Sequence, residues 1–77
     1  METELLKRIT VNPGIFNGKP IIRGMRFTVA DVLDLLLADM TPDEIINDYP
    51  FLERDDIRAA LLYASLRLKN TLIINAA

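Results

Sequence analysis

Two prolines, Pro42 and Pro50, restrict the secondary structure of this chain more than any other feature of the sequence. Pro42 lies between Thr41 and Glu44, in the order of a capping box with proline at the first helical position. Pro50 disfavours helical backbone at the residue before it, so a helix that begins at Pro42 has room for only about two turns. The sequence therefore predicts a short helix over 42–48.

Apolar residues at helical spacing predict a longer helix on each side of this one. The first covers about 29–38, and Thr28 is placed to cap it, with Asp31 near its positive end. Asp39 stands where a glycine would often end a helix, and aspartate tolerates left-handed backbone better than most residues. The last helix is expected over about 53–69.

The last helix carries two apolar stripes on nearly opposite sides at about 100° per residue. A helix on the surface of a monomer needs only one such stripe. Either the small domain covers its longest helix on both sides, or the second stripe is a surface for a partner chain. The first stripe consists of Ile57, Ala60, Leu61, Ala64 and Leu68, and the expected partner interface consists of Ala59, Leu62, Tyr63 and Leu66.

Residues 7–28 predict a short N-terminal β-hairpin. The segment 7–11 is rich in β-branched residues, and turn signals follow at 12–14 and 17–20. The segment 20–28 reads as extended chain broken at Gly24, with Pro20 suited only to a sheet edge. The fold class expected is therefore mainly α, with three helices over 29–69 after a hairpin.

Positive charge is concentrated toward the N-terminus. Residues 1–28 carry five basic and two acidic side chains, whereas 29–77 carry four basic and nine acidic ones. The glycines of 17–24 have an architectural explanation, because turns need them. The functional alternative is a positive hairpin that contacts phosphates or acidic protein groups. The candidate residues for DNA or another anionic partner are Lys19, Arg23, Arg26, Arg54 and Arg58. A solvated edge is the simpler explanation for the last two. For Arg26 the simpler explanation is an architectural role, in which it pairs with Asp31 or caps carbonyls.

The 77 residues suffice for one domain, 1–77, and a chain this short is only marginally stable alone. It contains no Cys and no His, so disulfides, the usual zinc sites and the common catalytic sets are missing. We expect no enzyme activity, metal or cofactor, and a partner chain or homo-oligomer as the extra source of stability. No apolar run reaches a membrane span, so a cytoplasmic protein without membrane contact is expected.

The short helix, the turn at 49–52 and the longer helix form a helix–turn–helix pattern, a motif that serves DNA reading in many proteins. In this chain the second helix of the pair begins with the residues Glu53, Arg54, Asp55 and Asp56, three of which are acidic. Those carboxylates suit the helix dipole but repel phosphates. DNA reading by this end of the helix is therefore disfavoured.

Thirteen residues of these segments form one pattern along the chain. They are Gly18, Lys19, Pro20, Arg23, Gly24, Arg26, Val29, Tyr49, Pro50, Leu52, Ala60, Leu61 and Tyr63. The pattern resembles that of the small bacterial family known as domain of unknown function 433. The resemblance covers about residues 8–66 and implies a homeodomain-like, three-helix helix–turn–helix domain behind the hairpin. It further implies an antitoxin of a type II toxin–antitoxin pair, which inhibits a PIN-like ribonuclease toxin and represses its own operon by binding operator DNA.

Two positions depart from the family pattern. Asp39 stands in place of the usual Gly, and Glu53 in place of Thr or Ser, which leaves the last helix with a poor N-cap. A DNA-binding regulator without a toxin and a homo-oligomeric interaction module remain as alternatives. The tail, 70–77, could continue the helix, form a strand or become ordered on a partner.

Overall fold

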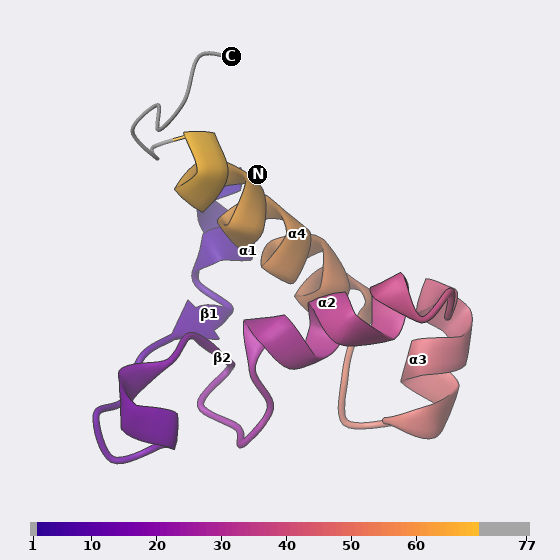
Figure 1. Cartoon of the computed structure of the whole chain (residues 1–77), viewed down its shortest axis with the longest axis horizontal. Coiled ribbons are helices and arrows are strands. Elements are labelled where there is room, and N and C mark those ends of the chain that lie inside the picture. The colour runs from indigo at the N-terminus through magenta and orange to yellow at the C-terminus, as the bar shows by residue number, and fades with distance from the viewer. Residues whose placement is uncertain (1, 70–77) are drawn as a thin grey trace, which may run out of the picture.

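The computed structural model describes residues 2–69 of the chain, which form a mainly helical unit with a small sheet at one end. Figure 1 shows the long helix α4 running diagonally, with the sheet and its loops at one end of the molecule and α3 at the other. The elements are α1 (Glu2–Leu6), β1 (Ile9–Thr10), the 3-10 turn η1 (Phe16–Gly18), β2 (Ile21–Ile22), α2 (Val29–Leu37), α3 (Pro42–Asp48) and α4 (Arg54–Lys69).

The capping residues expected from the sequence begin α2 and α3. The Thr41 hydroxyl accepts the Glu44 N–H, and the Glu44 carboxylate accepts the Thr41 N–H at 2.8 Å. Thr28 and Asp31 form the same reciprocal pair at the start of α2, with both distances at 2.9 Å. Each box satisfies N–H groups that have no partner within the helix, so both starting points are confirmed.

The end of α2 confirms the expected role of Asp39. Its φ is +67°, in the left-handed region. Its N–H donates to the Leu36 carbonyl at 3.0 Å, and the Met40 N–H donates to the Leu35 carbonyl at 3.2 Å. This is the Schellman arrangement, which satisfies the last carbonyls of a helix and turns the chain away.

The predicted hairpin is confirmed in a very small form. Ile9 pairs with Ile22 and Thr10 with Ile21 in a two-stranded antiparallel sheet. The connection between the strands is long and contains η1, so most of 7–28 is loop and turn. The sheet nevertheless buries Ile21 and Ile22 completely, and so anchors the loops to the helices.

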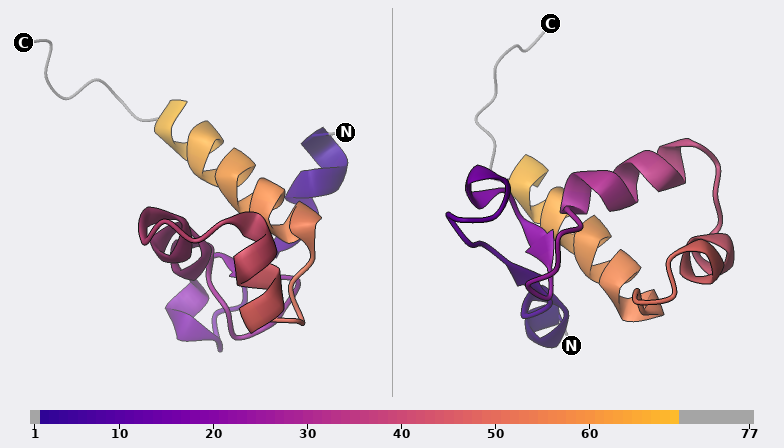
Figure 2. Two further views of the ribbon diagram at one scale, coloured as in Figure 1. Left: turned by 90° about the vertical axis from the view of Figure 1, so that its right-hand side faces the viewer. Right: turned by 90° about the horizontal axis from the view of Figure 1, so that it is seen from below.

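Helix α4 is flanked by α2 on one side and by α1 on the other (Figure 2). The five-residue helix α1 was not expected from the sequence. Isolated helices of this length are unstable, so α1 depends on its packing against α4. Part of the second apolar side of α4 is therefore covered by this chain's own N-terminus.

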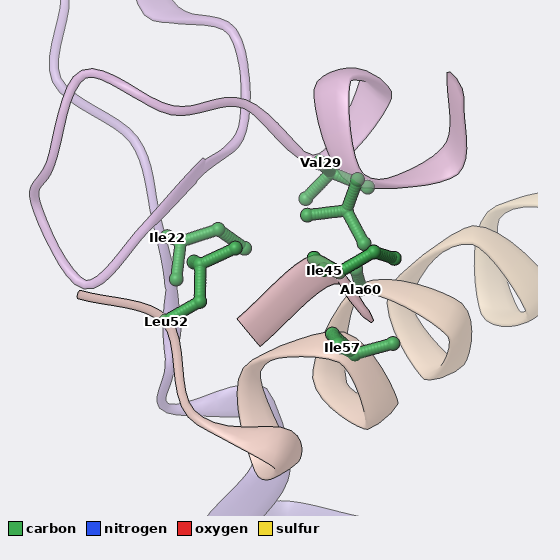
Figure 3. Packing of buried hydrophobic residues seen from close by; sticks show 7 residues of the cluster. Ile22, Val29, Ile45, Leu52, Ile57 and Ala60 are labelled. Atoms are coloured by element: carbon green, nitrogen blue, oxygen red, sulfur yellow. The ribbon is translucent and has the colours of Figure 1, made fainter. Parts of the chain in front are cut away.

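The hydrophobic core lies where the sheet, α2, α3 and α4 meet. Figure 3 shows Ile22 and Leu52 close together at one side, with Ile45, Ile57 and Ala60 beside them. All five are at most 2% exposed. The full cluster of buried residues is Ile22, Val29, Val32, Ile45, Leu52, Ile57 and Ala60.

The two-stripe interpretation of α4 needs correction. Leu61 and Leu68, assigned to the first stripe, are 47% and 74% exposed, whereas Ala59, assigned to the partner interface, is fully buried. The buried side is one broad arc, and Asp56 lies near its centre between Ala59 and Ala60 when the helix is viewed end-on at about 100° per residue. Because Asp56 is charged, the sequence pattern showed a gap there and divided one buried arc into two stripes.

Candidate protein-binding surface

A buried carboxylate organises the charged residues of the domain. Asp56, in the first turn of α4, has a fully enclosed side chain. It accepts hydrogen bonds from Arg8 Nη1 at 3.0 Å, Arg23 Nε at 3.0 Å and Arg23 Nη2 at 2.8 Å. The backbone N–H of Glu53 donates to it at 2.8 Å. We call Arg8, Arg23 and Asp56 the buried ion cluster.

The cluster keeps Asp56 ionised. Burial by itself raises the pKa of this carboxyl, because it penalises the charged form. The hydrogen bonds from Arg23, the Glu53 N–H and Arg8 outweigh that penalty and hold the pKa below its ordinary value of 3.8. Asp56 is therefore a fixed negative charge at neutral pH, with its hydrogen-bonding capacity filled by the chain itself.

Arg23 reaches Asp56 from a tight turn. Arg23 and Gly24 have φ values of +44° and +72°, and the Met25 N–H donates to the Ile22 carbonyl at 2.8 Å. Positive φ at both central positions defines a type I′ turn, which glycine adopts without strain. Arg23 Nη2 also donates to the Phe51 carbonyl at 2.8 Å. The side chain expected to contact an anionic partner thus fastens the turn to the α3–α4 connection.

The two arginines of α4 in the candidate set are also paired. Arg54 contacts Asp43 of α3, and Arg58 contacts Asp55 at 3.2 Å on the same helix. These pairs are exposed and each contributes little to stability. They nevertheless place a carboxylate beside both cations, which weakens the positive potential that a phosphate backbone would meet.

Lys19 and Arg26 differ from the other three candidates. Both side chains are exposed, and within residues 2–69 neither makes a hydrogen bond or an ion pair. The structure thus pairs three of the five cations with carboxylates and leaves these two without such a partner among residues 2–69. Lys19 lies beside Pro20 at the edge of a hydrophobic groove, whereas Arg26 does not line that groove.

The groove runs between the start of α2 and the last turns of α4. Its volume is about 380 Å³, and nearly all of its surface is apolar. Ala30 and Leu33 of α2 line one side, and Ala64 and Leu68 of α4 line the other. The charged residues along it are Lys19 and Arg67, both basic. The apolar walls suit the side chains of a protein segment better than the phosphates of a nucleic acid.

The residues expected at a partner interface are divided among several environments. Tyr63 is half-buried, contacts the core and lines the groove. Leu66 lines a smaller hollow that Leu6 and Ile9 share on the side covered by α1. Leu62 is half-buried, and Ala59 has no exposed surface. Tyr63 is thus the member of that set that lies in the groove.

Arg8 and the structural role of Asp56 were not expected from the sequence. A local signal for Asp56 did exist, because it stands three residues after Glu53, the position from which an acidic side chain accepts the N-cap N–H. Nothing local points to Arg8, which lies 48 positions away. Within residues 2–69, no group of three or more potential ligands is placed to hold a metal ion, and no helix is long and apolar enough to cross a membrane.

Comparison with known proteins identifies the family. The model of the family described as "Protein of unknown function (DUF433)" matches residues 9–64. The chain belongs to this family. It is also 34% identical over 56 residues to the "Uncharacterized protein y4eO" of Sinorhizobium fredii (strain NBRC 101917 / NGR234). That alignment covers 73% of the chain and 25% of the relative, so the chain spans about a quarter of that protein's length. No solved structure gives a significant match.

The DUF433 match begins at Ile9 in β1 and ends at Ala64 in α4. It therefore includes Arg23 and Asp56 of the buried ion cluster and most of the groove. Tyr49, in the matched region, packs against Phe27 and Phe51 with ring centroids 5.2 and 6.1 Å apart. α1 and Arg8 precede the match.

Proposed function

We propose that this DUF433 chain is an antitoxin-like protein of a type II toxin–antitoxin pair, which binds and inhibits a PIN-like ribonuclease in the cytoplasm. It acts by binding and has no catalysis of its own. The proposal includes a homeodomain-like arrangement of α2, α3 and α4, supported by the order and lengths of these helices.

The distribution of charge is the observation that carries the proposal. Three of the five candidate cations, Arg23, Arg54 and Arg58, are held by this chain's own carboxylates. Among the residues that the structure describes, nothing covers the apolar groove, and Lys19 at its rim has no ion pair. PIN-like nucleases bind metal through clustered carboxylates, so an exposed lysine is a suitable group to offer such a protein.

Operator binding by the domain alone is the weaker alternative. A reading helix needs a start that phosphates can approach, whereas the start of α4 carries the exposed carboxylates of Glu53 and Asp55 and packs beside Asp43. Repression of the operon therefore fits a toxin–antitoxin complex, in which the partner supplies further contacts to DNA, better than the isolated chain.

The test is co-purification with the product of the reading frame adjacent to this gene, followed by a ribonuclease assay of that product. We expect a stable complex and loss of cleavage when the chain is present in equimolar amount. Free nuclease activity that the chain leaves unchanged would refute the proposal. In parallel, anisotropy with the upstream DNA at low salt separates the alternative, because DNA binding would be strongest there and fall steeply with added salt.

A further inference from the structure

We propose that the groove between α2 and α4 binds an amphipathic helix of the partner protein whose apolar stripe is bordered by acidic residues. The inference rests on the proposed function and specifies which surface of the chain meets the nuclease. It goes beyond the positions that the sequence marked for a partner, because Ala30 and Leu68 line the groove and were not among them.

The shape of the groove favours a helix as the occupant. Its two sides are themselves helices, α2 and α4, and each contributes one alanine and one leucine, namely Ala30 with Leu33 and Ala64 with Leu68. Small side chains allow a third backbone to approach closely, and the leucines on either side can pack between its turns. An amphipathic helix in such a groove uses residues at i, i+3 or i+4 and i+7.

The charge of the rim favours acidic residues beside that apolar stripe. Both charged residues that line the groove are basic, although the chain as a whole has a net charge of −2. Leu68, 74% exposed, lies on the same stretch of α4 as Arg67. An acidic border on the incoming helix would pair with Lys19 and guide its approach, whereas a basic one would be repelled.

A second copy of this chain suits the groove poorly. A two-fold contact through it would place the same basic rim on both sides of the interface, so like charges would face each other. The acidic helices α1 and α3 could supply the missing charge, but their apolar residues are already committed. Leu5, Leu6 and Ile46 are half-buried in their own chain, and Ile45 is fully buried.

The experiment compares two groove variants with two matched controls in the complex with the adjacent reading frame's product. Leu68→Asp is paired with Leu37→Asp, because both leucines are exposed and lie in the last turn of their helices. Lys19→Glu is paired with Lys7→Glu, since Lys7 is an exposed lysine outside the groove. Circular dichroism shows that each variant folds before its affinity is measured.

We expect Leu68→Asp to weaken the complex at least about tenfold and Lys19→Glu roughly threefold to tenfold, with the controls within about twofold of the parent chain. If both groove variants bind like their controls, the docking surface is wrong while the proposed function stands. If the parent chain forms no complex, the proposed function fails and this inference fails with it.

A photo-crosslink identifies the occupant directly. p-Benzoylphenylalanine is introduced in place of Leu68 in the full chain, and crosslinked peptides are mapped after irradiation of the complex. A crosslink to an acidic, amphipathic helix of the nuclease supports the proposal. A crosslink to a second copy, to residues 70–77 of the same chain or to a basic segment of the nuclease overturns it.

Discussion

Replacing Asp56 by asparagine tests whether the buried ion cluster holds the domain together. Asparagine has nearly the shape of aspartate, so the packing around it is preserved while the charge and part of the acceptor capacity are removed. In the native chain the two carboxylate oxygens accept four hydrogen bonds, three from arginines and one from the Glu53 N–H. The asparagine amide would keep one acceptor oxygen, but its NH₂ group would face N–H donors of the arginines or of Glu53 and could accept no hydrogen bond from them.

The expected loss follows from those contacts. Breaking a buried ion pair by removing one partner costs about 3–5 kcal/mol, because the remaining charge is left uncompensated. We expect a value at the low end of this range, because the side chains of Arg8 and Arg23 are 27% and 35% exposed and can be hydrated. They also retain contacts with Glu53 and with the Phe51 carbonyl. We therefore expect the free energy of unfolding to fall by about 3 kcal/mol.

A loss of this size is large for a short domain. A chain of 77 residues has a free energy of unfolding of roughly 4–12 kcal/mol, so Asp56→Asn would remove at least a quarter of it. For domains of this length, about 3 kcal/mol corresponds to a fall in Tm of roughly 12–24 °C. Far-UV circular dichroism follows both thermal and urea unfolding, which suits a helical chain without tryptophan.

Asp55→Asn is the matched control for this measurement. Asp55 is the adjacent residue, with the same chemical change, but its side chain is 48% exposed and its contacts with Arg58 and Arg8 lie at 3.2 and 4.0 Å. An exposed pair contributes at most about 1 kcal/mol. If the two variants unfold within about 1 kcal/mol of each other, the buried ion cluster does not stabilise the fold in the way these contacts indicate.

Two further predictions concern acid stability and the turn at 22–25. The pKa of Asp56 is lower in the folded chain than the ordinary 3.8 of an unfolded one, so its contribution to stability is present above that value and is lost as pH falls toward the folded pKa. Urea unfolding between about pH 7 and pH 2 should therefore show a smaller loss of stability toward acid in Asp56→Asn than in the parent chain. Parallel curves of stability against pH would contradict this. Gly24 has φ +72° and no atom within 4 Å of an added Cβ, so Gly24→Ala should cost about 1–2 kcal/mol through the backbone alone. Gly24→Asn should cost less, because asparagine tolerates this conformation better, and equal losses in thermal unfolding would point to a steric cause instead.

Local signals predicted much of the fold. The starts of α2 and α3 depend on Thr28 and Thr41 and on acids three residues later, so each could be read from four consecutive residues. The prediction of where α2 ends depended on Asp39 alone. Such features are visible in a sequence because both partners lie within one helical turn.

What the sequence could not predict depends on contacts between distant segments. No pattern in α1 predicts a helix of five residues, so its packing against α4 could not be foreseen. Arg8 and Asp56 are joined across 48 positions, so neither marked the other as a partner. The groove arises from the packing of α2 against α4 and includes Pro20 and Lys19 from a third segment, so spacing along one helix could not outline it.

The span of the buried ion cluster has a consequence for the order in which the domain forms. The capping boxes and the turn at 22–25 join residues three positions apart and can form as soon as the chain leaves the ribosome. Arg8 and Arg23 must wait for Asp56, and closing so long a loop is entropically slow. The cluster should therefore form after the main folding barrier, so that weakening it speeds unfolding far more than it slows folding. The lifetime of the folded chain, more than its rate of folding, then depends on one carboxylate.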